Sequence, residues 1–251
     1  MITFVGAGPG AVDLITVRGK EFLEKADIVI YAGSLVNPEL LNYTKESCKS
    51  YNSAEMTLQQ VISVMEQGEE QGMNTVRLHT GDPSIYGAIR EQMDLLEQKG
   101  IEYEIVPGVS SFCGAAAAMK AEYTLPAVSQ TVILTRMEGR TAVPENEEIS
   151  KLAAHQASMV IFLSTSMLEE LSRRLISGGY DKKTPAAIVY KATWPDEKIV
   201  KTCVGDLYSS AKEHNINKTA LILVGDFLGS EYELSKLYDP AFTHEFRKAA
   251  E

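Results

Sequence analysis

Glycine and proline gather in short stretches that directly follow apolar runs, and the first is Gly6-Ala7-Gly8-Pro9-Gly10. Glycines directly after a strand let the backbone approach a ligand closely, and Gly6, Gly8 and Ala11 satisfy the G-x-G-x-x-A pattern of dinucleotide sites. Pro9 argues against a dinucleotide, because pyrophosphate is held by backbone N–H groups and proline has none. The stretch predicts ligand binding, with a plain strand-to-helix turn and a dinucleotide site as alternatives.

Two further stretches of this kind are Thr80-Gly81-Asp82-Pro83 and Val106-Pro107-Gly108-Val109-Ser110-Ser111. Asp82 before Pro83 is typical of a helix start, and Ser110 and Ser111 can cap a second helix. Gly81 lies at the end of an expected strand, where open α/β sheets bind their ligands. Because parallel strands end at one edge of a sheet, all three stretches are predicted to meet there.

Residue patterns for metal binding or nucleophilic catalysis are absent from the sequence. The four histidines have no partner at ligand spacing, and no C-x-x-C, H-E-x-x-H or G-x-S-x-G pattern occurs. His79 is the one histidine beside a candidate loop, and the others are expected at the surface or at strand ends. We therefore predict a site without a metal.

Composition excludes several classes of protein. The 24 Lys+Arg against 34 Asp+Glu give a net charge of −10, which argues against a partner bound through nucleic-acid phosphates. No apolar run has the length of a membrane helix, and the amino terminus has no basic region typical of a signal peptide. The 3 cysteines are scattered, as in a reducing cytosol. We predict a cytoplasmic protein with neither a nucleic-acid nor a membrane partner.

The first half of the chain alternates short apolar runs with amphipathic stretches, which indicates a mostly parallel sheet with helices on its faces. The expected strands are Ile2–Gly6, Asp27–Tyr31, Thr75–Thr80 and Tyr103–Val106. The expected helices are Val17–Lys25, Leu58–Glu70, Ser84–Gln98 and Ser110–Lys120.

The second half repeats this alternation. Its expected strands are Thr131–Thr135, Met159–Leu163, Ala186–Tyr190, Lys198–Val204 and Thr219–Val224, and its helices lie near Asn146–Ala154, Ser166–Ile176 and Asp206–Glu213. The short link around Trp194 favours an antiparallel hairpin, so this sheet is predicted to be mixed. The pattern is interrupted at Glu122–Gln130. We predict two α/β domains, residues 1–124 and 125–251.

Together, these stretches resemble the signatures of the tetrapyrrole methylases. The match comprises Val5-Gly-Ala-Gly-Pro-Gly-Ala-Val-Asp-Leu-Ile-Thr-Val-Arg-Gly19, Gly81-Asp-Pro83 and Pro107-Gly-Val-Ser-Ser111. The resemblance implies an S-adenosylmethionine-dependent methyltransferase, with S-adenosylhomocysteine as product. It also implies a ligand cleft between the two domains and a homodimer.

Other stretches resemble one branch of that family, the precorrin-4 C11-methyltransferases of cobalamin synthesis. They are Tyr31–Val36, Gln130–Arg140, Tyr190–Val200 and the carboxy-terminal run from Ser235 to Arg247. The substrate implied is a polycarboxylate tetrapyrrole. The Trp194–Lys198 and carboxy-terminal stretches favour the cobalt-containing substrate of the anaerobic route, with metal-free precorrin-4 as the alternative.

The resemblance also implies roles for individual residues. The cofactor is expected to contact Pro9, Thr80, Gly81, Asp82, Ile85, Ser110, Ser111, Leu163, Tyr190 and Ala192. The substrate carboxylates need cations, and those in or beside the motifs are Arg18, Arg77, Arg136, Arg140 and Lys191. Several relatives carry an aspartate in the turn after the second strand, but Tyr31-Ala32-Gly33-Ser34 has no carboxylate. No catalytic base is therefore assigned, and His79, Tyr31, Ser34 and water are the candidates to accept a proton.

Rival interpretations belong to other classes. One is a nicotinamide-dependent oxidoreductase that uses the Gly6–Gly10 loop, and another is a non-catalytic carrier of a corrinoid or cofactor. Within the methylases, methylation at a neighbouring ring position such as C17 or C20 is the nearest competitor.

Overall fold

The computed structural model describes residues 1–33, 35–139 and 141–248. The chain forms two compact units. The first consists of Met1–Ala115 together with Lys191–Glu197, and the second consists of Ala116–Tyr190 and Lys198–Glu251. Each unit contains one 5-stranded sheet with helices, which confirms the predicted pair of α/β sheets. The exact boundary between residues 124 and 125 stays a prediction.

All strands of the first sheet are parallel, as predicted for a sheet built from alternating strands and helices. In the order β3-β2-β4-β1-β5, they are β3 (Lys49–Asn52), β2 (Ile28–Tyr31), β4 (Thr75–His79), β1 (Ile2–Gly6) and β5 (Tyr103–Val106). Strand β3 was not predicted from the sequence. It lies at the edge of the sheet, is partly exposed, and so lacks the apolar run of the central strands.

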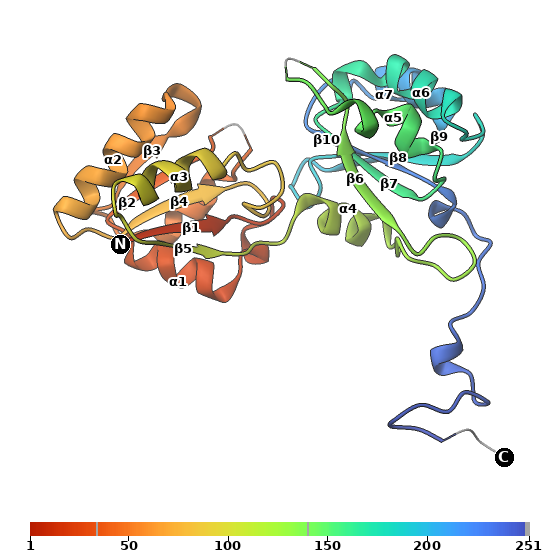
Figure 1. The fold of residues 1–251 in the computed structure, drawn as a ribbon, viewed down its shortest axis with the longest axis horizontal. Helices are drawn as coiled ribbons and strands as arrows, with labels where there is room; N and C mark the ends of the chain where they lie inside the picture. The colour runs from red at the N-terminus through yellow and green to blue at the C-terminus, as the bar shows by residue number, and fades with distance from the viewer. Residues whose placement is uncertain (34, 140, 249–251) are drawn as a thin grey trace. The chain divides into compact units, whose positions relative to one another are not determined.

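Helices cover both faces of the first sheet (Figure 1). On one face, Leu23 of α1 (Val17–Lys25) shares a hydrophobic cluster with Val5 of β1 and Val29 of β2. On the other face, Phe4 shares a cluster with Met65 of α2 (Leu58–Glu70) and Leu96 of α3 (Arg90–Gln98). These side chains are fully buried, and the apolar surface they remove from water stabilises the sheet that positions the loops.

The predicted helix Ser84–Gln98 is only partly correct, because α3 begins at Arg90. Asp82 accepts hydrogen bonds from Ser84 as expected of a cap, but the chain then turns, with Tyr86 at φ 55° and Ala88 at φ 49°. Left-handed residues of this kind cannot continue a right-handed helix. The helix start predicted at Asp82 is therefore wrong, and this residue closes a turn instead.

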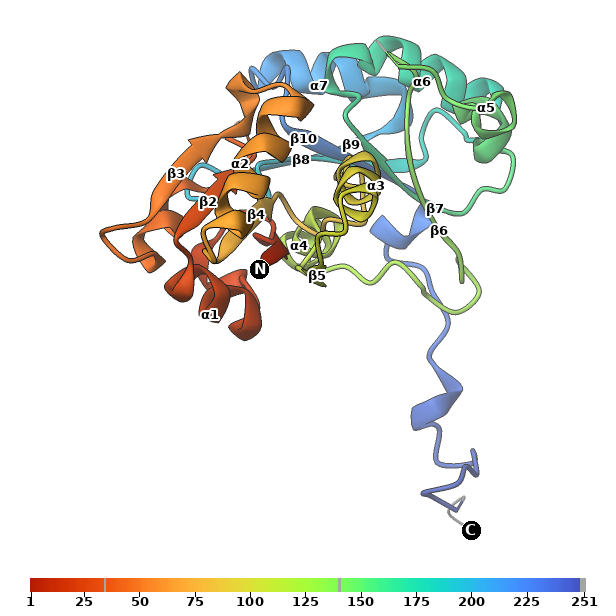
Figure 2. The ribbon, with the colours of Figure 1, turned by 60° about the vertical axis from the view of Figure 1, so that its left-hand side comes forward.

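The second sheet is mixed, as predicted. In the order β6-β7-β10-β8-β9, its strands are β6 (Val132–Arg136), β7 (Ser158–Phe162), β10 (Ala220–Val224), β8 (Pro185–Tyr190) and β9 (Lys198–Cys203). Only β6 and β7 pair in parallel, and β8 with β9 forms the predicted antiparallel hairpin. The helices that share its core are α5 (Ile149–Ala153), α6 (Leu168–Ser177) and α7 (Leu207–Glu213). Figure 2 shows these helices beside the sheet. Helix α4 (Ser111–Met119) precedes this sheet in the chain.

Two findings bear on the class of protein. Within residues 1–33, 35–139 and 141–248, no helix combines the length and the apolar character needed to cross a bilayer. The thiols of Cys48, Cys113 and Cys203 are all free.

Candidate functional site

Three glycines from three loops pack backbone against backbone at the carboxyl edge of the first sheet. A Cβ atom on Gly6 would lie 2.5 Å from the Cα of Gly108, and one on Gly108 would lie 2.2 Å from the carbonyl oxygen of Gly81. No other residue type fits such contacts without moving the backbone. The predicted meeting of the three loops at one edge is confirmed.

Hydrogen bonds fix the loop Gly6–Ala11, named here the glycine loop, to the loop that follows β4. The N–H of Ala7 donates to the carbonyl of His79 at 2.7 Å, and Gly8 and Gly81 exchange two bonds of 3.2 and 2.9 Å. Gly8 has φ 80° and Gly81 has φ 61°, conformations that glycine adopts at little cost. The backbone around β1 and β4 is thus set before any ligand binds.

The dinucleotide alternative does not fit this geometry. The N–H of Gly8 donates to Gly81, the N–H of Ala11 donates to Thr193 Oγ1 at 3.0 Å, and Pro9 has no N–H. The next α-helix, α1, begins only at Val17, after a short 3-10 turn. Pyrophosphate needs several open N–H groups at the start of a helix, whereas most N–H groups of this loop are already bonded or missing and no α-helix begins there.

Asp82 ties the second and third loops together. Its Oδ2 accepts the N–H of Gly108 at 2.8 Å, while its Oδ1 accepts the N–H of Ser84 at 2.8 Å and the Ser84 hydroxyl at 2.5 Å. Partial burial by itself would raise the pKa of this carboxyl, but these hydrogen bonds outweigh burial and lower the pKa below its usual range. Asp82 is therefore a charged clamp across the site.

We expect Asp82→Asn to weaken this clamp, because an amide cannot accept all three hydrogen bonds. The unfolding free energy should fall by about 1 kcal/mol for this partly exposed group, and binding of a ligand at the loops should weaken in parallel. Urea denaturation and ligand calorimetry measure the two effects. Asp13→Asn, on an exposed carboxylate of the same unit, is the matched control and should change neither.

A polar group with unused hydrogen-bonding capacity lies beside the clamp. Thr80 Oγ1 is buried and has no hydrogen-bond partner among the residues that the structure describes. A buried hydroxyl without a partner is costly, so a polar ligand atom at this point would be stabilising. A Cβ on Gly81 would lie 3.4 Å from Ser110 Cα and from Ser111 N, which places both serines against the same loop. Ile85 donates its N–H to the carbonyl of Asp82 at 3.2 Å.

The remaining predicted cofactor contacts lie later in the chain. Leu163 and Tyr190 belong to the second unit, whereas Ala192 lies in the Lys191–Glu197 segment that joins the first. Leu163 has φ 53° and is 63% exposed, an uncommon combination for a bulky apolar residue. Backbone strain of this kind concentrates at functional sites.

Arg77 and His79 lie on the same face of β4 and are both buried. The Arg77 guanidinium donates to Gln92 Oε1 and to the carbonyl of Ile30, each at 3.1 Å, and burial lowers its pKa to about 10. His79 stacks on Phe4, and burial together with the charge of Arg77 lowers its pKa to about 3. Its imidazole is therefore neutral near pH 7 and a poor proton acceptor.

The other cations predicted to bind the substrate differ in exposure and in the partners that they already have. Arg136 donates to the carbonyls of Met137, Thr141 and Ala142, and so fixes the loop after β6. Arg18 is exposed on α1, and Lys191 pairs with Asp196 at 2.6 Å. Arg140 and Ser34 lie outside the described residues.

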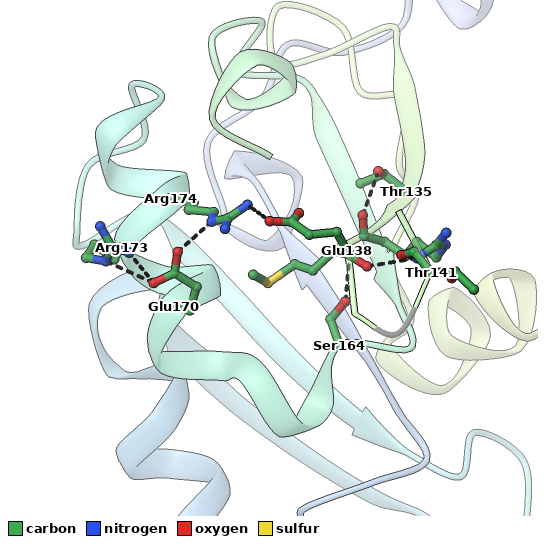
Figure 3. Close-up of polar contacts among 9 residues, drawn as sticks. Thr135, Glu138, Thr141, Ser164, Glu170, Arg173 and Arg174 are labelled. Atoms are coloured by element: carbon green, nitrogen blue, oxygen red, sulfur yellow. Dashed lines mark hydrogen bonds and ion pairs between the residues drawn. The ribbon is translucent and has the colours of Figure 1, made fainter. Parts of the chain in front are cut away.

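The loop after β6 is also attached to α6. Glu138 pairs with Arg174 at 2.5 Å, Arg174 pairs with Glu170 at 2.6 Å, and Glu170 also contacts Arg173 (Figure 3). Ser164 Oγ accepts the N–H of Met137 at 2.9 Å, next to Leu163 in the chain. These bonds give the second unit a defined loop next to two predicted site residues, Arg136 and Leu163.

Tyr31, a proton-acceptor candidate, ends β2 and has a partly buried side chain that packs on the apolar cluster of that face. Three residues at the glycine loop were not predicted. Asn37 Nδ2 donates to the carbonyl of Gly10 at 2.9 Å, and Thr193 and Trp194 bond to the same loop. Two signals were available for Thr193 and Trp194: the single tryptophan lies beside a proline, and both residues belong to the stretch Tyr190–Val200 that resembles the precorrin-4 C11-methyltransferases.

Comparison with known proteins agrees with this geometry. The family described as Tetrapyrrole (Corrin/Porphyrin) Methylases matches residues 1–208. The chain belongs to the tetrapyrrole methylase family. This methylase is 54% identical to the cobalt-precorrin-4 C(11)-methyltransferase of Methanocaldococcus jannaschii, over 99% of this chain and 96% of the relative. It is 41% identical to the precorrin-4 C(11)-methyltransferase of a Sinorhizobium species, over 100% of this chain and 99% of that protein.

A solved structure extends the likeness to the fold. The X-ray structure of a cobalamin biosynthetic enzyme, cobalt precorrin-4 methyltransferase, superposes with a TM-score of 0.89 at 47% identity. The match covers 91% of this methylase and 96% of that chain.

Proposed function

We propose that this chain is an S-adenosylmethionine-dependent methyltransferase of cobalamin biosynthesis that methylates C11 of cobalt-precorrin-4 to give cobalt-precorrin-5A. The observation that carries the proposal is the 54% identity, over 99% of the chain, to a cobalt-precorrin-4 C(11)-methyltransferase. The lower identity of 41% to a relative named for precorrin-4 favours the cobalt-containing substrate over the metal-free one.

The loops of the first unit fit S-adenosylmethionine. Close backbone packing at Gly6, Gly81 and Gly108 leaves an edge built of main chain, and the unpartnered hydroxyl of Thr80 offers a hydrogen bond to a polar ligand. We propose that the residues holding the cofactor are Pro9, Thr80, Gly81, Asp82, Ile85, Ser110, Ser111, Leu163, Tyr190 and Ala192. When bound, S-adenosylmethionine supplies a methyl group on sulfur that passes to carbon by direct displacement.

The chain's own task is then mostly alignment. The substrate carbon is the nucleophile, so the protein needs to hold two molecules in line, an effect worth roughly 7–11 kcal/mol in well-oriented reactions. His79 is too weak a base to take the proton that leaves the substrate, because burial lowers its pKa to about 3. Tyr31, Ser34 and water remain the candidates to accept this proton.

Cations are proposed to bind the substrate carboxylates. The candidates remain Arg18, Arg77, Arg136, Arg140 and Lys191. Arg77 already serves the sheet and Arg136 already fixes its own loop, so their contribution to substrate binding has to compete with these bonds. Exposed Arg18 has no such competing bond within the described residues. A homodimer and a cytoplasmic location also stay part of the proposal, as predictions from the sequence.

An anaerobic assay with methyl-labelled S-adenosylmethionine tests the function. Cobalt-precorrin-4 and metal-free precorrin-4 are supplied in parallel, and NMR locates the new methyl group on the product. We expect labelling at C11, with the higher kcat/KM for the cobalt substrate. Labelling at another carbon, or binding of NADH in place of S-adenosylhomocysteine, would contradict the proposal. Cofactor and substrate binding without any transfer would instead support a carrier.

The same assay examines the substrate cations. We expect the double variant Arg136→Ala/Arg140→Ala to raise the KM for the tetrapyrrole while the affinity for S-adenosylhomocysteine holds. An unchanged KM would remove both arginines from the proposed substrate site.

A further inference from the structure

The segment Lys191–Glu197 connects β8 to β9 in the second sheet, yet it groups with the first unit. It contains Trp194, the only tryptophan of the chain. The side chains of Thr193 and Trp194 form hydrogen bonds with the glycine loop. The hairpin tip is therefore part of the glycine-loop structure.

Consecutive residues of the glycine loop are held by this segment. The indole Nε1–H of Trp194 donates to the carbonyl of Pro9 at 3.1 Å, and the N–H of Ala11 donates to Thr193 Oγ1 at 3.0 Å. Between them, the Trp194 ring covers Gly10 so closely that a Cβ there would lie 2.1 Å from its Cδ1. The loop is fixed on both sides of Gly10 by side chains more than 180 positions away.

The segment is itself held in an uncommon conformation. Lys191 has φ 46° and Thr193 has φ 70°, and a β-branched residue is strained in that region. Several bonds maintain it: Glu197 Oε2 accepts the N–H of Thr193 at 2.6 Å, and Lys191 Nζ lies 2.6 Å from Asp196 Oδ2 and 5.1 Å from the centre of the Trp194 ring. A strained backbone that several contacts maintain, as at Lys191 and Thr193, indicates a functional constraint.

The glycine loop also packs on the start of α4. A Cβ on Gly114 would lie 2.9 Å from Pro9 Cβ and 3.2 Å from Thr193 Cγ2. Pro9, Gly114 and the hairpin tip therefore form one packed group next to Ser110 and Ser111, which are proposed cofactor contacts. A displacement of the tip would move Pro9 relative to these serines.

We propose that Trp194 and Thr193 are positioning residues that set the glycine loop for S-adenosylmethionine, an inference that rests on the proposed function. A loop ordered in advance does not lose conformational freedom when the ligand binds, so its affinity is higher. Neither residue supplies a reacting group. Their loss should therefore raise the KM for S-adenosylmethionine and the Kd for S-adenosylhomocysteine, with kcat changed little.

The test uses the full-length protein and S-adenosylhomocysteine. Trp194→Phe removes the indole donor, and Thr193→Val removes the acceptor for Ala11 at almost constant volume. Each is expected to weaken binding about tenfold, the factor that corresponds to one lost hydrogen bond of typical strength. Thr193→Ser keeps the hydroxyl and should restore binding to within about twofold of the wild type.

Thr57→Val is the matched control. It deletes a hydroxyl that caps α2 in the same unit, so it should lower stability and leave the Kd unchanged. The tryptophan also provides a spectroscopic readout, since all tryptophan fluorescence of the wild type comes from Trp194. Its emission should change on titration with S-adenosylhomocysteine, with the same Kd that calorimetry gives.

The outcomes separate the two proposals. If the wild type does not bind S-adenosylhomocysteine, the proposed function is overturned. If the wild type binds and the Thr193→Val and Trp194→Phe proteins bind equally well, the positioning role is overturned while the function stands. A fall in kcat at constant KM would also overturn it. If Trp194→Phe fails to fold, the comparison of Thr193→Val with Thr193→Ser decides alone.

Discussion

Replacement of Gly108 by alanine is expected to abolish cofactor binding and to lower the unfolding free energy by about 3 kcal/mol. The new Cβ would lie 2.2 Å from the carbonyl oxygen of Gly81 and 2.7 Å from Gly6 Cα. Both are backbone atoms, so a side-chain rotation cannot relieve the overlap, and the loops have to separate. The separation would also break the bond between the Gly108 N–H and Asp82.

Chemical denaturation and calorimetry with S-adenosylhomocysteine measure these effects against two glycine controls. Among the described residues not adjacent in the chain, the atom nearest to a Cβ on Gly139 would be Met167 Cε at 4.0 Å, so Gly139→Ala should change stability by less than about 0.5 kcal/mol. Gly100 has φ 67°, and a Cβ there would have no described atom within 4 Å apart from those of its chain neighbours, so Gly100→Ala isolates the cost of a left-handed backbone, about 1 kcal/mol. If Gly108→Ala binds the cofactor product as the wild type does, the packed glycine edge does not form the site.

The second large effect is a loss of stability in acid caused by His79. Burial and the charge of Arg77 lower its pKa to about 3, against 6.5 in an exposed residue. Between these values the unfolded chain binds a proton that the folded chain does not, so the unfolding free energy falls as the pH falls. Each pH unit costs about 1.4 kcal/mol, which gives about 3 kcal/mol between pH 7 and pH 4.

His79→Leu removes the titrating group and should flatten this part of the pH profile, measured by urea denaturation at intervals from pH 7 to pH 4. His155→Leu is the control, because His155 is exposed and its loss should leave the slope of the wild type. Equal slopes for His79→Leu and the wild type would show that His79 is not the group responsible. Activity near pH 7 is expected to persist in His79→Leu, because an imidazole with a pKa of about 3 is too weak a base to take the proton from the substrate.

The parallel sheet and the meeting of its loops could be predicted from local patterns. Strand β1 is Ile2–Gly6 in the structure, as predicted, because a short apolar run followed by glycines is typical of a buried strand that ends at the glycines. The edge strand β3 was missed because a strand that is half solvated needs no apolar run. Residues 84–89 were predicted as helix because Asp82-Pro83 resembles a helix start, and left-handed residues such as Tyr86 leave no pattern that identifies them.

Individual side-chain roles were harder to predict. Arg77 stays a predicted substrate contact, but its place in a motif did not indicate that the alternation of β4 would direct it to the buried face, beside Phe4 and Gln92. The bonds from Thr193 and Trp194 to the glycine loop join distant parts of the chain, and such contacts depend on the tertiary fold rather than on neighbouring residues. The resemblance to the tetrapyrrole methylases implied that Ala192, two residues before Trp194, contacts the cofactor. It did not indicate that this segment bonds to the glycine loop.

The late position of Lys191–Glu197 in the chain has a consequence for synthesis. A nascent chain that ends at Ala115 already contains all five strands of the first sheet, but it lacks the groups that bond to Pro9 and Ala11. At 5–20 residues per second, roughly 80 more residues take on the order of ten seconds to emerge. During that interval the sheet that carries the glycine loop is complete, but the loop forms its hydrogen bonds with Thr193 and Trp194 only after the β8–β9 hairpin leaves the ribosome.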